Sequence, residues 1–530
     1  MSWVKTVPCS ELQRRPVVFQ HPPKQVALFS VAGSVYAVDN RCPHEGYPLV
    51  EGQVDGACTL TCNWHNWKFR LSDGRCILGG DNVRSYETRV EDGYVWLNLA
   101  DPSPEVVQAE ILDGLHEAFR KQEYDRICRE LSRLHFYDLD PLVAVRRAVE
   151  WSHDRFEFGF VHAYAATADW LTLAQQFPGQ WEPRLVCLAE SIDHMAHTAL
   201  RHPVYPFGAA GEPFTTQGFA DVVEAENPQA AEGMVLQGLA DGLHWHDMHE
   251  ALTSAALAHY NDFGHSLIYV YKAAQLIEHL GPEIEPFLLP TLARHLCYTT
   301  REDLLPDFRD YAGALAALQS GAWGKSTASD PLPYPSTTKQ ALAWVVRNAP
   351  SHTPEALYQA LLEALARNFL YYDAGYDTQY HRPVSDNVSW LSFTHGITFA
   401  NAVRTQCAPV PALWVPGLLQ MACFVGRNRR YLDLEFAQPE GKWVVADADG
   451  FFEEVAELLL DHGVREPIYA AHLVKTARAV QEELPDAFET CRFYLLASLN
   501  RFLHSPIKQK HVRRFARQAV ALVGRDFQAS

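Results

Sequence analysis

Two short segments near the N-terminus each pair a cysteine with a histidine. Cys42 is followed by His44, and after 17 further residues Cys62 is followed by His65. Two thiolates and two imidazoles can hold the two irons of a [2Fe–2S] cluster, with the thiolates on one iron and the imidazoles on the other. A zinc site is the alternative, but zinc favours more closely spaced pairs. The four residues therefore predict an iron–sulfur centre that carries single electrons.

The elements that must position these residues change character along the chain. Alternating apolar and polar residues predict strands over 26–31, 34–38, 88–90 and 94–99. Later, apolar residues recur at helical spacing, which predicts helices over 142–173, 249–280, 354–367 and 455–462. We therefore expect an α+β multidomain protein. Its parts would be a small antiparallel-β domain over 1–100, a linker and connecting helix over 101–134, and a large mainly α-helical domain over 135–530.

Around the four ligands the sequence resembles the Rieske ferredoxin and Rieske oxygenase family. Residues 38–46 look like the first cluster loop of that family, and Trp64, Trp67 and Phe69 match the second loop and the strand after it. The resemblance covers about residues 1–100. It implies a Rieske [2Fe–2S] cluster with Cys42, His44, Cys62 and His65 as ligands. It also implies an electron donor, either an NAD(P)H-dependent reductase or a ferredoxin.

The second loop departs from the family at two positions. The family usually has proline where this chain has Asn63, and glycine where it has Asn66. These departures leave the four ligands in place. They put the backbone geometry of the loop and its hydrogen bonds to the cluster in question.

The rest of the chain lacks the usual acceptor of a Rieske oxygenase. In that family the acceptor is one iron held by two histidines and a carboxylate, in an Asp-x2-His-x4-His context beside a β-sheet. The nearest match here is Glu150 with His153, but His162 follows nine residues after His153, and the region has helical spacing. We therefore reject a standard Rieske oxygenase catalytic domain.

The helical region is instead similar to the questin oxidase family, whose members share isolated histidines in helices followed by small and aromatic residues. The matching histidines here are His153, His162, His259, His265 and His395. The resemblance spans about residues 135–515. It implies an oxygen-using, reductant-requiring oxidation of aromatic polyketide rings, for which a fused Rieske domain would supply the reductant.

Carboxylates lie near some of these histidines at helical spacing. Glu150 and Glu157 share a face with His153, and Asp262 precedes His265 by three residues. Carboxylate-x2-His pairs on facing helices occur in di-iron bundles, although chance yields a similar number of such pairs in this composition. We expect an additional non-haem iron, held by members of the five-histidine set with Glu150, Glu157 or Asp262 as carboxylate support. The alternative for each histidine is a buried imidazole with ordinary hydrogen bonds.

Composition limits the partners. The chain has 530 residues, with 45 Lys plus Arg against 64 Asp plus Glu, a net charge of −19. This balance argues against a nucleic acid or an anionic membrane as the main partner. The N-terminus lacks the pattern of a secretion signal, and the uncharged stretch over 405–426 contains three prolines, which disfavours a membrane span. We expect a cytoplasmic protein.

These observations predict an oxidoreductase. A Rieske cluster would relay electrons to a histidine-rich, iron-containing helical domain, which would act as an O2-dependent monooxygenase or oxidase on an aromatic or polyketide-like small molecule. Two alternatives remain open, an electron-transfer adaptor and a redox sensor, in which the helical domain docks a partner and holds no second metal. A homo-oligomer is also left open.

Overall fold

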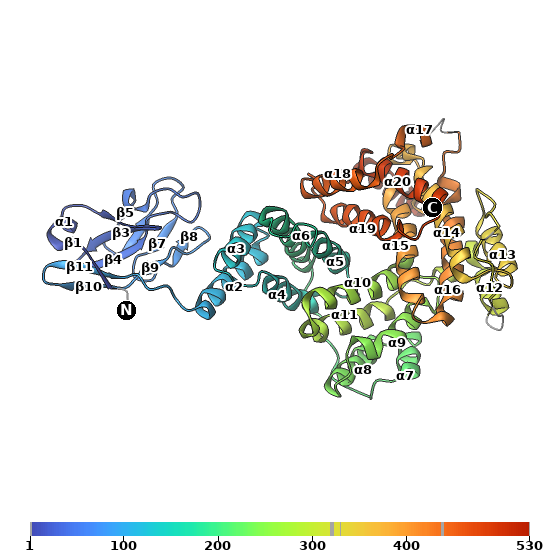
Figure 1. Cartoon of the computed structure of the whole chain (residues 1–530), viewed down its shortest axis with the longest axis horizontal. Coiled ribbons are helices and arrows are strands. Elements are labelled where there is room, and N and C mark those ends of the chain that lie inside the picture. The colour runs from blue at the N-terminus through green and yellow to red at the C-terminus, as the bar shows by residue number, and fades with distance from the viewer. Residues whose placement is uncertain (1–2, 319–322, 329, 436–438, 529–530) are drawn as a thin grey trace. The chain divides into compact units, whose positions relative to one another are not determined.

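A computed structural model describes residues 3–318, 323–328, 330–435 and 439–528. The chain divides into two compact units, Met1–Ala144 and Val145–Ser530. Antiparallel sheets lie in the first unit and the second is built from helices, which confirms the expected α+β class (Figure 1). Within the described ranges, no helix combines the length and the apolar character that crossing a bilayer requires.

Three small antiparallel sheets form the β part of the first unit. Their strand orders are β1-β11-β10, β2-β3-β4-β9 and β5-β6-β7-β8. The strands are β1 (Trp3–Pro8), β2 (Val17–His21), β3 (Lys24–Val31), β4 (Ser34–Asp39), β5 (Gln53–Val54), β6 (Thr59–Thr61), β7 (Lys68–Arg70), β8 (Cys76–Leu78), β9 (Ser85–Tyr86), β10 (Thr88–Glu91) and β11 (Tyr94–Asn98). The four strands expected from the sequence correspond to β3, β4, β10 and β11.

Two loops of the first unit carry the cysteine–histidine pairs. The first loop, residues 40–48, follows β4, and the second, residues 62–67, joins β6 to β7. Both cysteines lie in one core cluster with Leu49, Leu60 and Phe69. The apolar residues of the short sheets therefore anchor both loops in the same core.

The residues expected to form a linker and connecting helix belong to the first unit. They form α2 (Pro104–Lys121) and α3 (Tyr124–Phe136). Proline in the first turn of α2 suits a helix start, because that position needs no backbone N–H donor. Ile127, Leu131 and Leu134 of α3 are buried at a spacing of four and three, which gives this helix one apolar face.

The remaining helices lie in the second unit, except that α4 spans the division between the units and the short α1 (Cys9–Leu12) lies in the first. They are α4 (Leu142–Ser152), α5 (His162–Ala174), α6 (Trp181–Ala199), α7 (Thr216–Glu224), α8 (Pro228–Ala240), α9 (Trp245–Leu257), α10 (His265–Leu280), α11 (Glu285–Cys297), α12 (Tyr311–Leu318), α13 (Thr338–Asn348), α14 (Pro354–Leu370), α15 (Trp390–Cys407), α16 (Trp414–Asn428), α17 (Pro439–Trp443), α18 (Ala448–Leu460), α19 (Pro467–Glu483), α20 (Glu489–Leu503) and α21 (Val512–Gln528).

Two helices that the sequence predicted as continuous are interrupted. The expected helix over 142–173 stops after α4 and restarts at α5, because Phe156 and Val161 adopt extended backbone. The expected helix over 249–280 stops after α9, and Asp262 and Phe263 have φ angles of 43° and 51° before α10 begins. Both predictions were wrong at these points. Each break makes a histidine the first residue of the next helix.

Four helices of the second unit form a closed ring of contacts. α5 packs against α10 and α19, and α15 packs against the same two helices (Figure 1). α15 is buried at most positions, which is typical of a helix inside a large core rather than at its surface.

Candidate metal centres

The two ligand loops of the first unit have the same backbone hydrogen bonds. The N–H of Cys42 donates to the carbonyl of Tyr47 at 2.9 Å, and the N–H of Cys62 donates to the carbonyl of Trp67 at 2.8 Å. In both loops the chain therefore folds back five residues after the cysteine. The histidine of each pair lies inside this turn.

Gly46 in the first loop and Asn66 in the second occupy equivalent positions, which explains how the second loop accommodates asparagine in place of glycine. The N–H of Gly46 donates to the carbonyl of Cys42, and the N–H of Asn66 donates to that of Cys62. Gly46 has a φ of 79° and Asn66 a φ of 62°. After glycine, asparagine is among the residues that most readily adopt this left-handed conformation. Asn66 thus takes the backbone geometry that the family usually obtains with glycine.

The other departure in the loop adds a contact. The side-chain amide of Asn63 donates to the carbonyl of Glu51 at 2.6 Å. Glu51 ends a short 3-10 turn, Leu49–Glu51, that follows the first loop. A side-chain hydrogen bond therefore ties the second loop to the first at the position where the family usually has a rigid proline.

The two thiols are buried beside each other. Cys42 is 3% exposed and Cys62 is 2% exposed. Burial raises the pKa of the Cys42 thiol to about 11, and the neighbouring Cys62 adds to the rise. A thiol in this setting does not ionise at neutral pH unless a cation stabilises the thiolate. The two cysteines are therefore suited to binding a metal ion as thiolates.

The two imidazoles lie at the outer edge of the site. The ring centroids of His44 and His65 are 4.6 Å apart, with the rings at 82° to each other. The His65 side chain is 39% exposed, and a carboxylate oxygen of Glu45 lies 3.7 Å from its Nδ1. Buried thiols with imidazoles outside fit a Rieske [2Fe–2S] cluster. When bound there, such a cluster supplies single-electron transfer.

A second group of histidines meets inside the helical unit. We call His162, His265, His395 and His472 the four-histidine cluster; they lie on α5, α10, α15 and α19. The Nε2 atom of His265 is 3.1 Å from that of His162 and 2.9 Å from that of His395. The Nε2 atoms of His395 and His472 are 3.2 Å apart. The ligand nitrogens of His162, His265 and His395 all lie within 4.8 Å of one another, so three helices of the ring contribute imidazoles that could hold one metal ion. His472 joins the cluster through its contact with His395.

In two of these histidines, the Nδ1 atom forms a hydrogen bond with a backbone carbonyl. The Nδ1–H of His265 donates to the carbonyl of Asp262 at 2.6 Å, and the Nδ1–H of His472 donates to the carbonyl of Ile468 at 2.7 Å. A neutral imidazole that donates from Nδ1 has a lone pair on Nε2. At least two lone pairs therefore point into the cluster, where only a proton or a cation between them relieves their repulsion.

The electrostatics of the cluster keep its rings neutral. Burial lowers the pKa of all four histidines, that of His472 to about 3. The buried Lys475 lowers them further, and burial lowers its own pKa to about 8. Among the described residues, the Nζ of Lys475 has no hydrogen-bond partner. Neutral imidazoles are the form that binds metal ions.

A strained turn positions His265. Asp262, Phe263 and Gly264 all have positive φ, the last at 75°. This turn aims the Asp262 carbonyl at the ring of His265. The Asp262 carboxylate lies behind the ring, 3.7 Å from Nδ1 of His265 and 3.4 Å from Nε2 of His295. Burial raises the pKa of the Asp262 carboxyl to about 7. Asp262 thus supports His265 from outside the cluster.

The structure places the other expected residues elsewhere. The Nδ1 of His153 bonds the Glu150 carbonyl at 2.6 Å, and the Glu150 carboxylate pairs with Arg147. His259 lies 2.7 Å from Glu224 and 3.3 Å from Asp303. Glu157 accepts a long hydrogen bond from Tyr205. Four residues that the sequence analysis proposed as metal ligands therefore make ordinary polar contacts outside the four-histidine cluster: His153, His259, Glu150 and Glu157.

His472 was absent from the residues expected at the site. It lies between Ala471 and Leu473 on a helix that is buried along most of its length. The sequence does carry a signal, because small and apolar residues surround it as they surround His162. The residue three positions before His472 is not a carboxylate, and so His472 does not match the carboxylate-x2-His pattern.

Comparison with known proteins identifies the β part of the first unit. The sequence profile of the Rieske [2Fe-2S] domain matches residues 2–87. The chain is 36% identical over 92 residues to the 4beta-methylsterol monooxygenase of Methylococcus capsulatus, which is 15% of this chain and 25% of that protein. It is 32% identical over 81 residues to the ferredoxin subunit of 3-phenylpropionate/cinnamic acid dioxygenase of Escherichia coli (strain K12), or 15% of this chain and 76% of the ferredoxin.

The ferredoxin of carbazole 1,9a-dioxygenase from Nocardioides aromaticivorans IC177 has a solved structure that is 21% identical. The match covers 18% of this chain and 97% of that one, with a TM-score of 0.17. The chain thus spans a quarter of the monooxygenase but most of the ferredoxin subunit. Through its N-terminal residues, which carry both cysteine–histidine pairs, the chain belongs to the Rieske [2Fe–2S] domain family.

Proposed function

We propose that this protein is an oxidoreductase that couples its Rieske cluster to a second, non-haem iron in the four-histidine cluster. Electrons would arrive from an NAD(P)H-dependent reductase or a ferredoxin. The helical unit would then use O2 to oxidise an aromatic or polyketide-like small molecule. Relatives of the Rieske domain that are named as a monooxygenase and as a ferredoxin subunit of a dioxygenase support the electron-transfer part.

The convergence of ligand nitrogens from three helices carries the proposal, because those of His162, His265 and His395 all lie within 4.8 Å of one another. The separations of 2.9 to 3.2 Å between neighbouring Nε2 atoms are those of ligands around one ion. Two nitrogens bound at right angles, each at a distance of about 2.1 Å from an ion, lie about 3 Å apart. The carbonyls that accept from Nδ1 of His265 and His472 fix the tautomer, as partners of metal-bound histidines commonly do.

The setting supports iron over a structural metal. Imidazole ligands suit zinc, copper, iron and nickel alike. A Rieske cluster in the same chain would deliver single electrons, and zinc cannot accept them because it is not redox-active. When bound, an iron with open positions supplies O2 chemistry. The protein contributes three neutral imidazole donors, of which His395 is buried and His162 and His265 are partly buried.

Aromatic rings beside the cluster support an aromatic substrate. The hydroxyl of Tyr269 is 3.1 Å from Nδ1 of His162, and the ring of Phe263 has its centroid 6.0 Å from that of His395. Phe160 stacks at a tilt on Tyr269 with centroids 4.8 Å apart. Apolar and aromatic walls with a few polar groups are typical of small-molecule sites. The resemblance to the questin oxidase family points to the same substrate class.

Iron analysis of matched variants tests the proposal. Wild-type protein should hold more than two irons per chain, and His265→Ala should lose the excess while retaining the reduced Rieske paramagnetic signal. His153→Ala is the control, because His153 is also half-buried and bonds a backbone carbonyl but lies outside the cluster. Two irons per chain in the wild-type protein, after reconstitution with excess iron, would contradict the proposal.

An electron-transfer adaptor is the second candidate. The match over 76% of a ferredoxin subunit favours it, since that relative is a separate electron carrier. Under this alternative, or that of a redox sensor, the four histidines share protons rather than a metal. The same iron analysis then gives two irons per chain in every variant that retains the Rieske ligands.

A further inference from the structure

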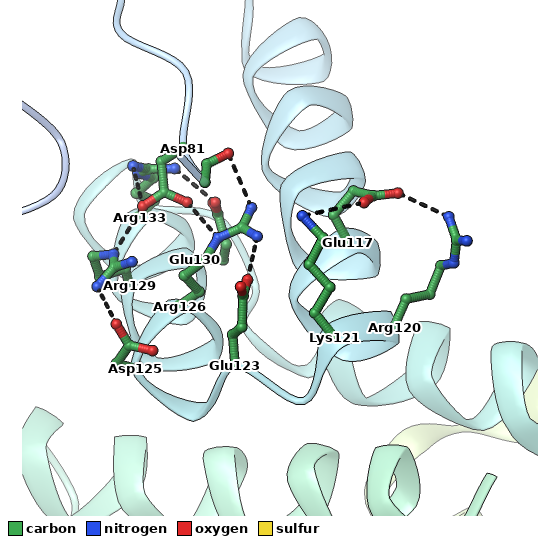
Figure 2. A network of polar contacts seen from close by, with 11 residues as sticks. Asp81, Glu117, Arg120, Lys121, Glu123, Asp125, Arg126, Arg129, Glu130 and Arg133 are labelled. Atoms are coloured by element: carbon green, nitrogen blue, oxygen red, sulfur yellow. Dashed lines mark hydrogen bonds and ion pairs between the residues drawn. The ribbon is translucent and has the colours of Figure 1, made fainter. Parts of the chain in front are cut away.

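Asp81 is the centre of a buried charge network in the first unit (Figure 2). Its side chain is 0% exposed. One carboxylate oxygen accepts from Nε of Arg126 at 2.7 Å, and the other accepts from Nε of Arg129 at 2.8 Å. Arg133 lies 3.8 Å from the second oxygen. The loop after β8 is thus held by three arginines of α3.

An outer layer of acidic residues holds the arginines in place. Glu123 pairs with Arg126 at 2.5 Å, Asp125 with Arg129 at 2.7 Å and Glu130 with Arg133 at 2.7 Å. Residues at these spacings lie on neighbouring turns of one helix. Both layers are visible in Figure 2, where the arginines point from α3 toward Asp81. The Asp81–Arg126 pair is buried on both sides, and such a pair holds its partners in one geometry, because an unpaired buried charge would be costly.

The network fixes the two glycines that precede Asp81. Nη2 of Arg126 donates to the carbonyl of Gly80 at 3.3 Å. A Cβ atom added at Gly79 would lie 2.4 Å from Cδ2 of Trp67, and one added at Gly80 would lie 3.2 Å from Cη2 of the same ring and 2.9 Å from Nε of Arg126. The backbone of both glycines therefore presses directly against the indole of Trp67.

Trp67 in turn contacts the cluster site in two ways. Its ring stacks on His44, with centroids 4.6 Å apart and an angle of 17° between the planes. Its carbonyl accepts the N–H of Cys62. Contacts thus run without a break from α3 through Asp81, the two glycines and Trp67 to the imidazole of His44.

We propose that Asp81 is a positioning residue of the Rieske centre. Held by Arg126 and Arg129, it keeps the two glycines against Trp67 and so sets the orientation of the His44 ring. The helix α3 is then part of the protein that shapes the iron–sulfur centre. This inference is independent of any metal in the helical unit.

The test is pulsed paramagnetic resonance on the reduced full-length protein, which resolves the couplings of the two coordinated histidine nitrogens. Asp81→Asn removes the charge that holds the arginines and keeps the size of the side chain. We expect one of the two nitrogen couplings to change while the other stays at its wild-type value. Glu117→Gln is the matched control, because Glu117 pairs with Arg120 at 3.0 Å on the neighbouring α2 and is exposed (Figure 2).

A double-variant comparison separates positioning from a change in local charge. If Asp81 acts through Trp67, Asp81→Asn should alter the coupling in the wild-type background and leave it unchanged in a Trp67→Leu background. An equal change in both backgrounds, or no change in a variant with full cluster content, would overturn the proposal. Should Asp81→Asn fail to fold, Arg126→Gln keeps the Asp81–Arg129 pair and is judged by the same two outcomes.

Discussion

The Nε2 atoms of His265 and His395 lie 2.9 Å apart, although the residues come from different helices and from distant parts of the sequence. His265 is the first residue of α10, directly after a strained turn, whereas His395 lies within α15. Neither helix alone would bring two imidazoles to one point. The ring of four packed helices, together with the break before α10, creates the juxtaposition.

His472 should support the second metal, although the sequence did not single it out. We expect His472→Ala to lower the iron affinity of the helical unit by about 10-fold to 100-fold, because His395 loses the imidazole that lies 3.2 Å from its Nε2. Metal titration of protein depleted with a chelator measures this. His194→Ala is the control: His194 is also buried, with a pKa lowered to about 3 mainly by burial, yet it is not one of the four. Equal affinity in both variants would remove His472 from the site.

The turn before His265 should couple backbone strain to metal binding. An added methyl at Gly264 would lie 2.6 Å from Phe399 on α15, the helix that carries His395. Gly264→Ala should therefore cost about 1–2 kcal/mol for the left-handed backbone and more for the clash, and it should weaken iron binding. Gly242→Ala has a similar φ of 86° with nothing within 4 Å of the methyl. Thermal unfolding should show a smaller loss for Gly242→Ala, with unchanged iron; similar iron loss in both variants would contradict the coupling.

The sequence was sufficient to predict the Rieske part of the molecule, because its determinants are local. Cys42 and His44 lie in one turn and Cys62 and His65 in another, so short-range spacing alone identifies both. The strands next to them follow from period-two patterns and two-residue turns such as Asp92-Gly93. What spacing could not supply was the burial and pairing of Asp81, whose partners lie on a helix more than 40 residues further along the chain.

The second site was less predictable, because it depends on where helices stop. His153 and His259 have the same aromatic surroundings in the sequence as His162 and His265. However, His153 lies in a short 3-10 turn after α4, and His259 lies in the segment after α9. Asp262 and Phe263 adopt left-handed backbone conformations, which are rare for residues other than glycine. The spacing of apolar residues does not indicate such conformations. Helical spacing therefore predicted which residues share a helix face, but it wrongly predicted one continuous helix where the structure has α4 and α5, and another where it has α9 and α10.

Asn66 should be replaceable only by residues that adopt a left-handed backbone. Asn66→Gly should keep the cluster signal with stability equal to or slightly above that of the wild type. Asn66→Val should lose cluster content, because a β-branched residue at a φ of 62° is strongly disfavoured. Visible absorption and iron content of the purified variants provide the comparison. Full cluster content in Asn66→Val would show that the turn does not depend on this conformation.

The Glu130 carboxyl should make α3 less stable as the pH rises. Burial raises its pKa to about 7 from an ordinary value of 4.5. Because the folded carboxyl holds its proton more tightly, its contribution to stability is complete below pH 4.5 and is lost as the pH passes about 7. The loss should be on the order of 1–3 kcal/mol.

Hydrogen exchange of the α3 amides, corrected for the intrinsic pH dependence, measures this effect. Protection in the wild type should fall between pH 5 and pH 8 relative to Glu130→Gln, which has no titrating carboxyl. Glu117→Gln removes an exposed carboxyl and should follow the wild type. Parallel profiles for the wild type and Glu130→Gln would place the ionisation outside this range.

The most direct test of the central claim follows the Rieske cluster itself during one turnover. Full-length protein is reduced chemically without O2 and then mixed with O2, while visible absorption reports reoxidation of the cluster. If electrons leave through a metal in the four-histidine cluster, His395→Ala should retain the cluster and reoxidise at least about 10-fold more slowly than the wild type. His259→Ala should match the wild type. Equal rates in His395→Ala and the wild type would contradict the account and favour an electron-transfer adaptor.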